Sequence, residues 1–223
     1  MGCRQDMAAV SGVPASDRGD SRERIVAAAV RVFARKGFQR ASLDEIAADA
    51  GLTKGAIYWH FRSKNDLFFS LLERCFERNT APLPADIARA VASAGPDNRR
   101  EVMIALFRSV LRRFREDADW PRLLLEFLAQ SRDAGIAARL RQLCEQGRLV
   151  ARSAAEQLQQ GGLIAPALDA DMLAVFWGAL LDGLMIAWLV QPETMADDRL
   201  ISRMADMLAS GMLPAERSVD QGD

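Results

Sequence analysis

The sequence predicts an all-α protein, with a small N-terminal unit of three helices and a larger helical C-terminal unit. Apolar residues recur at spacings of three and four from Asp20 onward, as at Ile25, Ala28 and Val32, and no segment alternates for long like a β-strand. Glycine and proline interrupt this pattern where short loops would join helices. Because half of the 223 residues are hydrophobic, the chain can bury a substantial core.

The N-terminal region carries several helix-boundary signals. Residues 1–19 mix Gly, Pro, Ser and Asp without periodicity, so we expect a flexible arm there. The first helix follows from Asp20 and ends at Gly37, a residue type favoured just past a helix C-terminus. Ser42-Leu43-Asp44-Glu45 is typical of a capping box and opens a second, short helix.

A tight turn and two further helices come next. Gly51 is predicted to make the turn, and Thr53 to cap a third helix that runs from Lys54 to about Phe61. A fourth helix begins near Ser63, and Pro82 and Pro84 are expected to stop it and to mark a domain boundary. The later periodic segments predict helices over 85–94, 98–117, 120–131, 134–160, 169–190 and 197–210.

The composition excludes several classes of site. His60 is the only histidine, which removes metal sites built on two histidines and leaves little for a catalytic triad. Cys3, Cys75 and Cys144 match no metal or redox spacing; we expect Cys75 and Cys144 to be buried and unreactive, with a redox-sensing thiol as the alternative. Since the chain also lacks a P-loop and a nucleophile elbow, we expect no enzyme, no metal site and no cofactor.

Hydropathy and charge indicate the compartment and the kind of partner. Residues 1–20 lack the apolar stretch of a secretory signal, and Asp182 interrupts the longest apolar run, so we expect a cytoplasmic protein without a membrane partner. Residues 18–80 hold 12 basic and 8 acidic side chains, whereas residues 81–223 hold 16 basic and 20 acidic ones. A mildly basic N-terminal part suits contact with a polyanion.

The two short helices within residues 42–61, joined by a glycine turn, fit a helix-turn-helix. In that motif the second helix enters the DNA major groove, which is about 12 Å wide, so the helix must be slim and polar at its N-terminal end. Thr53-Lys54-Gly55-Ala56 meets both needs, because two of these residues are small and Lys54 can donate to guanine. The spacing therefore predicts a DNA-reading helix that begins at Thr53.

The segment from Gly51 to Phe61, followed by Lys64 and Leu67, resembles the signature of TetR-family repressors, especially AcrR-type efflux regulators. This resemblance covers roughly residues 22–70. It implies phosphate contacts from four side chains, namely Ser42, Tyr58, His60 and Lys64. It implies base contacts from Lys54, Gly55 and Ala56, and a phosphate or base contact from Thr53.

Two residues of this region receive other interpretations. Some members of the family have a basic residue where Asp44 stands, so we expect Asp44 to act as a favourable charge at a helix N-terminus rather than as a base contact. Trp59 is expected to pack in the core.

The resemblance further implies a DNA-binding domain over 20–66 and a ligand-binding and dimerisation domain over 67–213, with a disordered tail over 214–223. Large apolar residues on helical stripes are expected to form plain core, with a subset lining a cavity; the candidate wall residues are Phe107, Leu111, Trp120, Leu124, Phe127 and Trp177. Polar candidates in the same helices are Arg108, Arg112, Glu126, Gln130 and Asp182. Because residues 169–190 are apolar on most of the helix circumference, a partner subunit is a natural cover for them.

The predicted function is a ligand-responsive transcriptional repressor. A homodimer is expected to bind a palindromic operator in double-stranded DNA and to be released by a small hydrophobic or aromatic effector. Two alternatives remain: a DNA-binding module governed by a protein partner or by its own abundance, and an enzyme that kept the N-terminal fold. Lack of a ligand-sized cavity would favour the first alternative, and detectable turnover the second.

Overall fold

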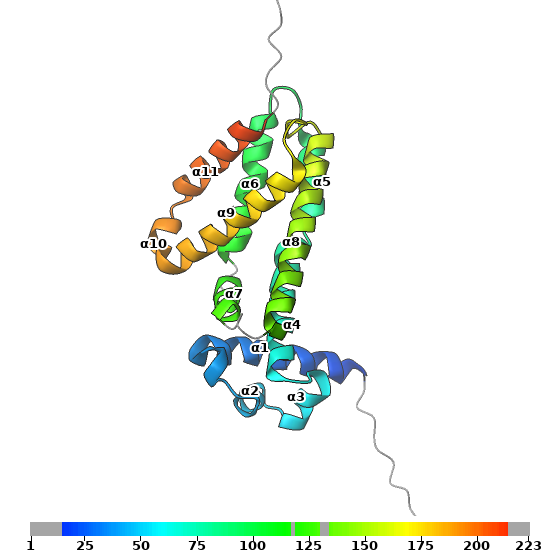
Figure 1. Cartoon of the computed structure of the whole chain (residues 1–223), viewed down its shortest axis with the longest axis vertical. Helices are drawn as coiled ribbons and strands as arrows, with labels where there is room; N and C mark the ends of the chain where they lie inside the picture. The colour runs from blue at the N-terminus through cyan, green and yellow to red at the C-terminus, as the bar shows by residue number, and fades with distance from the viewer. Residues whose placement is uncertain (1–14, 117–118, 130–133, 214–223) are drawn as a thin grey trace, which may run out of the picture. The chain divides into compact units, whose positions relative to one another are not determined.

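The computed structural model describes residues 15–116, 119–129 and 134–213, with the side chains of 15–19, 119, 120 and 127 left out. Every regular element within these ranges is a helix, which confirms the predicted all-α class (Figure 1). The chain divides into two compact units between Leu71 and Leu72, inside the continuous helix α4 (Lys64–Thr80). The expectations for residues 1–14 and for the tail over 214–223 lie outside the described residues.

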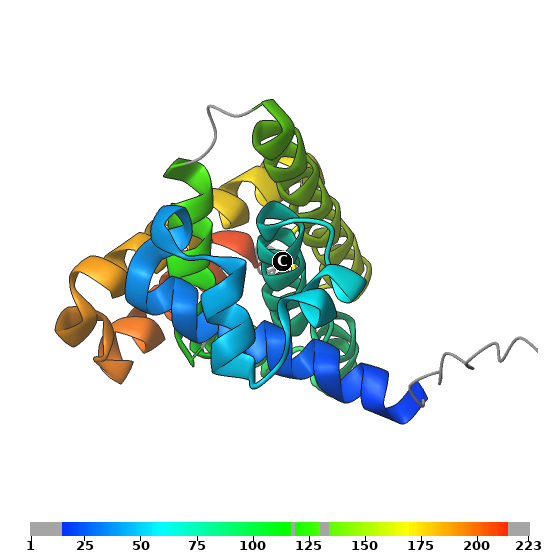
Figure 2. The same ribbon diagram turned by 90° about the horizontal axis from the view of Figure 1, so that it is seen from below.

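The first unit consists of α1 (Ala15–Arg40), α2 (Leu43–Ala50), α3 (Lys54–His60) and the first turns of α4. α1 packs against both short helices, which also pack against each other (Figures 1 and 2). The buried rings of Phe33, Phe38 and Phe68 form an aromatic cluster, with centroids 4.6–5.7 Å apart. Because Phe68 on α4 belongs to this cluster, the first unit extends past the predicted boundary at residue 66.

Both ends of α1 differ from the prediction. The helix begins at Ala15, so the expectation of a flexible arm is wrong for residues 15–19. Gly19 lies inside the helix, where a single glycine costs only about 1 kcal/mol relative to alanine. Gly37 has a φ of 73° and breaks the helix as predicted, although helical residues continue to Arg40.

The second unit contains the remainder of α4 and seven further helices among the described residues. These are α5 (Leu83–Ser93), α6 (Arg99–Glu116), α7 (Asp119–Ala129), α8 (Ala134–Gln160), α9 (Ala170–Val190), α10 (Pro192–Met195) and α11 (Asp198–Met212). Within this unit α8 packs along α9, and α11 packs along α6 (Figure 1). The six helices predicted here are confirmed with small shifts at their ends.

Proline positions account for the remaining differences. Pro84 lies in the first turn of α5, where its missing N–H would be unpaired in any case. Pro82 and Pro84 therefore separate two helices of one unit, and the prediction that they mark a domain boundary is wrong. Pro192, predicted to be only a break, starts the short helix α10 for the same reason.

α9 is the most apolar of the described helices. By length and composition alone it could cross a membrane, contrary to the expectation drawn from the interruption at Asp182. A core helix of a soluble protein meets the same criterion. Four residues of α9 are buried within the second unit: Leu173, Ala174, Leu184 and Met185.

The aromatic cluster generates a prediction about stability. Phe68→Ala removes a fully buried ring between Phe33 and Phe38, so we expect the free energy of unfolding to fall by about 3–5 kcal/mol. Urea denaturation followed by circular dichroism measures this change. Trp59→Ala, at a side chain that is 73% exposed, serves as the control and should change the free energy by no more than about 0.5 kcal/mol. Equal losses in the two variants would contradict the packing described here.

Candidate functional site

α2 begins at a complete capping box, as predicted. The Ser42 Oγ accepts a hydrogen bond from the Glu45 backbone N–H at 3.2 Å, and the Glu45 carboxylate accepts one from the Ser42 N–H at 3.1 Å. The buried side of α2 consists of Leu43, Ile46, Ala47 and Ala50. The box and the apolar side together fix where α2 starts and which side faces the core.

Gly51 makes the turn between α2 and α3. Its φ of 63° lies in the left-handed region, which favours glycine, and its N–H donates to the Ala48 carbonyl at 3.1 Å. Arg24 of α1 donates to the carbonyl oxygens of Ala50 at 2.8 Å and Gly51 at 3.2 Å. These contacts hold the turn against α1 and so define the direction in which α3 leaves it.

α3 is a short helix with a single buried side chain. Thr53 caps its N-terminus by accepting a hydrogen bond from the Ala56 N–H at 3.2 Å. Ile57 is fully buried, whereas Lys54 and Tyr58 are exposed. The helix therefore presents a slim, polar face to solvent, a shape that suits a groove about 12 Å wide.

The three residues at the C-terminal end of α3 have different environments. Tyr58 is 52% exposed and Trp59 is 73% exposed, so the prediction that Trp59 packs in the core is wrong. Ile57 alone occupies the inward position of this short helix, and its neighbour Trp59 points away from the core. His60 is half-buried; burial, and then the nearby charge of Arg22, lower its pKa, so the imidazole is neutral at pH 7.

Lys54 forms an ion pair that connects α3 to α2. Its Nζ lies 2.9 Å from the Asp44 carboxylate, and this hydrogen bond raises the pKa of Lys54. The sequence predicts that Asp44 interacts with the N-terminus of its helix. In the structure its carboxylate also pairs with Lys54. Gly55 is exposed and Ala56 half-buried on the same helix, so little side-chain bulk covers the backbone beside Lys54.

Lys64 has a structural role in the first unit that the sequence did not predict. Its Nζ donates to the carbonyl oxygens of Phe38 at 2.8 Å, Ala41 at 3.0 Å and Gln39 at 3.2 Å. The ammonium also lies 4.5 Å from the centroid of the Phe38 ring. Partial burial lowers the pKa of Lys64, but three charge-assisted hydrogen bonds hold the proton. The start of α4 is thereby fixed to the segment after Gly37.

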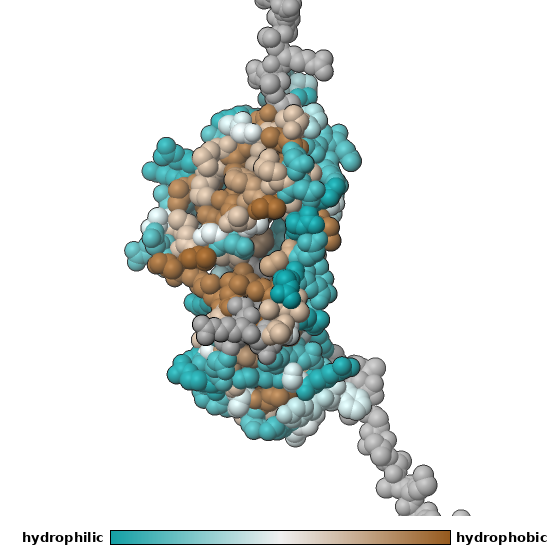
Figure 3. Space-filling view, viewed as in Figure 1, coloured by the Kyte–Doolittle hydropathy of each residue, from teal (hydrophilic) through white to brown (hydrophobic). Residues whose placement is uncertain are grey.

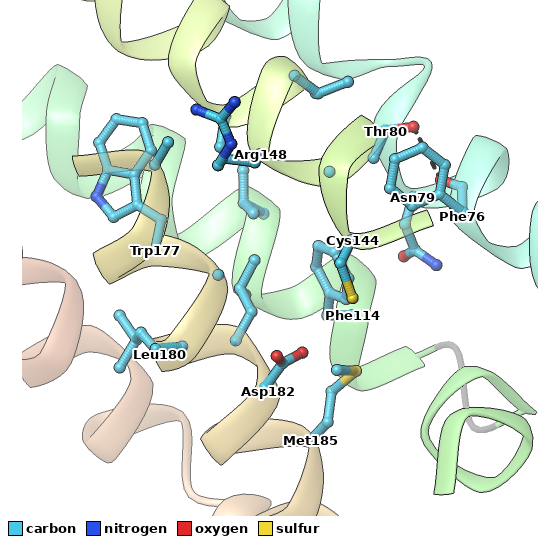
Figure 4. Close-up of a pocket in the computed structure, with 18 of the residues that line it drawn as sticks. Phe76, Asn79, Thr80, Phe114, Cys144, Arg148, Trp177, Leu180, Asp182 and Met185 are labelled. Carbon is cyan, nitrogen blue, oxygen red and sulfur yellow. Dashed lines mark hydrogen bonds between the residues drawn. The ribbon is translucent and has the colours of Figure 1, made fainter. Parts of the chain in front are cut away.

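The second unit contains a large cavity of about 520 Å³. Figure 3 shows a hollow in the surface of this unit, and Figure 4 shows side chains of α4, α6, α8 and α9 around the cavity. Among the predicted wall residues, four line it: Phe107, Leu111, Leu124 and Trp177. The side chains of Trp120 and Phe127, also predicted, lie outside the described part of the structure.

Other cavity residues were missed by the sequence analysis. Phe76, Asn79 and Thr80 of α4 line it, although every candidate predicted from the sequence comes from helices later in the chain. Of the polar candidates that the structure describes, only Asp182 lines the cavity. Arg108, Arg112 and Glu126 lie elsewhere, and Gln130 is outside the described residues.

The two described cysteines differ in environment. Cys75 is buried, as predicted, whereas Cys144 is exposed and lines the cavity, so its predicted burial is wrong. Although the residue is exposed overall, partial desolvation of its thiol, and then the nearby negative charge of Asp182, raise the pKa of Cys144. A raised pKa keeps this thiol protonated at neutral pH and argues against redox sensing at Cys144.

The hydrogen bonds of Lys64 generate a prediction that is independent of any ligand. Lys64→Met keeps the aliphatic stem but removes the three donors, so we expect the free energy of unfolding to fall by about 1–3 kcal/mol. Urea denaturation provides the measurement. Lys54→Met removes a solvent-exposed ion pair that water already screens, so it should be clearly less destabilising than Lys64→Met. A Lys64→Met variant no less stable than Lys54→Met would rule out the structural role of Lys64.

Comparisons with known proteins agree with this arrangement. Residues 25–71 match the family described as bacterial regulatory proteins, tetR family, and residues 99–212 match the BetI-type transcriptional repressor C-terminal family. The chain is 31% identical over 184 residues to the HTH-type transcriptional regulator AcrR of Shigella flexneri, covering 78% of this chain and 81% of that protein. It is also 31% identical over 184 residues to TtgR of Pseudomonas putida, covering 78% and 83%.

A solved structure shares the fold. Bacillus subtilis FadR in complex with stearoyl-CoA superposes with a TM-score of 0.66 at 18% identity, covering 84% of this chain and 96% of that chain. The relatives by sequence are transcriptional regulators rather than enzymes. The helix-turn-helix of α2 and α3, the helical second unit and these matches together show that the chain belongs to the TetR family of DNA-binding transcriptional regulators.

Proposed function

We propose that the protein is a ligand-responsive repressor whose dimer binds a palindromic operator and is released by a small hydrophobic or aromatic effector. The observation that carries this proposal is the continuity of α4. This helix starts at Lys64 in the first unit and supplies Phe76, Asn79 and Thr80 to the cavity wall in the second. A single helix that belongs to both units gives a ligand a physical means to act on the DNA-binding end.

The exposed face of α3 supports base reading. Lys54 offers a donor to guanine, and the small residues Gly55 and Ala56 allow the backbone to approach base edges. Ser42 and Thr53 accept hydrogen bonds as caps, yet each hydroxyl keeps a hydrogen that it can donate to phosphate.

Tyr58, His60 and Lys64, the other predicted phosphate contacts, differ in whether they must leave an existing contact to reach a phosphate. Tyr58 is exposed and needs no rearrangement, and the neutral imidazole of His60 can donate one N–H. Lys64 would have to give up at least one of its three carbonyl partners to reach a phosphate. We therefore assign Lys64 mainly to positioning the start of α4.

Exposed apolar side chains support the dimer. Met172 and Phe176 are nearly half exposed, Val190 is 70% exposed, and Leu149 of α8 is 51% exposed. These four residues are not part of the cavity wall, so a cavity ligand would leave them uncovered. Pairing of two subunits through α8 and α9 would bury them and would present two α3 helices to successive major grooves, about 34 Å apart.

The cavity supports the effector. Its volume of about 520 Å³ falls within the usual range for ligand pockets, and most of its wall is apolar. FadR, which has the same fold, was solved with stearoyl-CoA. A ligand-sized cavity favours effector control over the alternative of a DNA-binding module governed only by its abundance.

The central test measures oligomeric state, DNA binding and release. Analytical ultracentrifugation should show a dimer, and fluorescence anisotropy should show preference for a duplex from the chain's own upstream region over random duplex. A compound selected from neutral aromatic molecules by the rise in Tm it causes should weaken that binding about 5- to 150-fold, as coupling of about 1–3 kcal/mol produces. A protein that is monomeric at every concentration and shows no duplex preference at low salt would refute the proposal.

A substitution separates base reading from phosphate contact. Lys54→Ala should relax base preference at one position in each half-site by about 1–3 kcal/mol, because it removes the donor to guanine. Tyr58→Ala is the matched control and should weaken binding to all sequences alike. Anisotropy titrations on operator variants and on random duplex measure how much affinity each variant loses for specific and for random DNA. An equal loss on specific and random DNA from Lys54→Ala would remove it from the base-reading surface.

A further inference from the structure

The cavity wall carries very little charge. Most of its described residues are apolar, and the polar ones are Asn79, Thr80, Cys144, Arg148 and Asp182. Only Arg148 and Asp182 among them bear a formal charge. The chemistry of a ligand that suits this cavity therefore depends on how these two charges are already paired.

The charge of Arg148 is paired within the protein. Its guanidinium donates to the Glu145 carboxylate at 2.7 and 3.0 Å and to the Asp171 carboxylate at 2.7 Å. Two carboxylates thus face one guanidinium, although Asp171 also contacts Arg152 at 3.0 Å. Arg148 is consequently a poor site for an anionic ligand, because such a ligand would have to displace an internal partner.

The charge of Asp182 is unpaired among the described residues. Its carboxylate projects from α9 into the cavity, toward the same space as the Cys144 thiol and Met185 (Figure 4). Asp182 is solvent-exposed as a residue in the single chain, and the desolvation that its surroundings do impose raises the pKa of its carboxyl group. A carboxylate at an apolar wall without a counter-charge gains free energy when a cation with hydrogen-bond donors takes that place.

Aromatic rings indicate the remainder of the ligand. Phe107 and Trp177 lie edge to face, with centroids 6.3 Å apart, and Phe76 and Phe114 also line the cavity. These rings offer apolar area and π faces, both of which suit a flat, ring-bearing molecule.

We propose that this cavity selects amphiphilic cations, in which an apolar ring system carries a protonated amine that donates to Asp182. The inference rests on the proposed function of the cavity as the effector site and adds the charge of the effector. Asp182 acts as the specificity-determining residue, and the apolar wall provides affinity without regard to charge.

The test uses three fluorescent probes that differ only in the head group on a pyrene ring: 1-pyrenemethylamine, 1-pyrenemethanol and 1-pyrenecarboxylic acid. Their binding to the full-length protein is measured by fluorescence anisotropy at pH 7.5. We expect the amine to bind at least tenfold more tightly than the alcohol, and the acid to bind most weakly.

Two variants and one control locate this preference. Asp182→Asn, a near-isosteric neutral change, should reduce amine affinity to that of the alcohol while alcohol affinity stays within twofold, which also verifies that the cavity is intact. Asp182→Lys should reverse the order in favour of the acid. Glu193→Gln removes one negative charge from an exposed position on α10 and should leave the preference unchanged.

A pH series adds an independent readout. In a series from pH 8 to pH 5 the amine preference should decrease toward the acid end, because the pKa of Asp182 is raised and protonation removes the carboxylate charge. The other titratable groups at the described cavity wall keep their state in this range: Arg148 stays charged, and the Cys144 thiol stays protonated. Asp182→Asn should abolish this pH dependence.

The outcomes separate this inference from the function on which it rests. Equal affinity for amine and alcohol, or an unchanged preference in Asp182→Asn, overturns the cation proposal while the effector site stands. A change in the dimer dissociation constant of Asp182→Asn without any change in probe preference also overturns it, because Asp182 would then serve the subunit interface. If none of the three probes binds, the cation proposal and the effector cavity both fail.

Discussion

The first unit depends on the constraint that α3 must stay exposed and yet be held firmly. A helix of seven residues is too short to be stable alone, so tertiary contacts must supply what its own hydrogen bonds cannot. Ile57 provides the buried anchor, Thr53 caps the start, and Gly51 with Arg24 fixes the turn before it. Because these contacts come from the inner side and the ends, the outer face carries polar and small residues together with the exposed indole of Trp59.

The second unit meets a different constraint, since it leaves apolar surface unfilled. Its core is closely packed around α6, α8 and α11, yet a cavity of about 520 Å³ remains beside α9. An apolar cavity without a ligand forgoes dispersion contacts along its wall. A ligand that restored those contacts would stabilise the form of the protein that binds it, and the cavity wall includes residues of α4, the described helix that spans the boundary between the two units.

Features that depend on neighbours within a few residues could be predicted from the sequence, and those that depend on helix orientation could not. The Ser42 capping box, the Gly51 turn and the Thr53 cap involve partners about three residues apart, and all three are confirmed. The Lys54–Asp44 pair and the three carbonyl partners of Lys64 join different helices, so no local pattern reveals them. Trp59 was misplaced because a helix of two turns has too few apolar positions to define its inner side.

Lys64 illustrates how donor geometry can restrict a position to one residue type. Only three of the 29 basic residues in the chain are lysines, so arginine is the usual cation of this protein. At Lys64 the tetrahedral ammonium directs three hydrogens toward three carbonyl oxygens that converge on one point. A planar guanidinium spreads its hydrogens in a fork and cannot meet the same three acceptors from one atom, so arginine is no conservative replacement there.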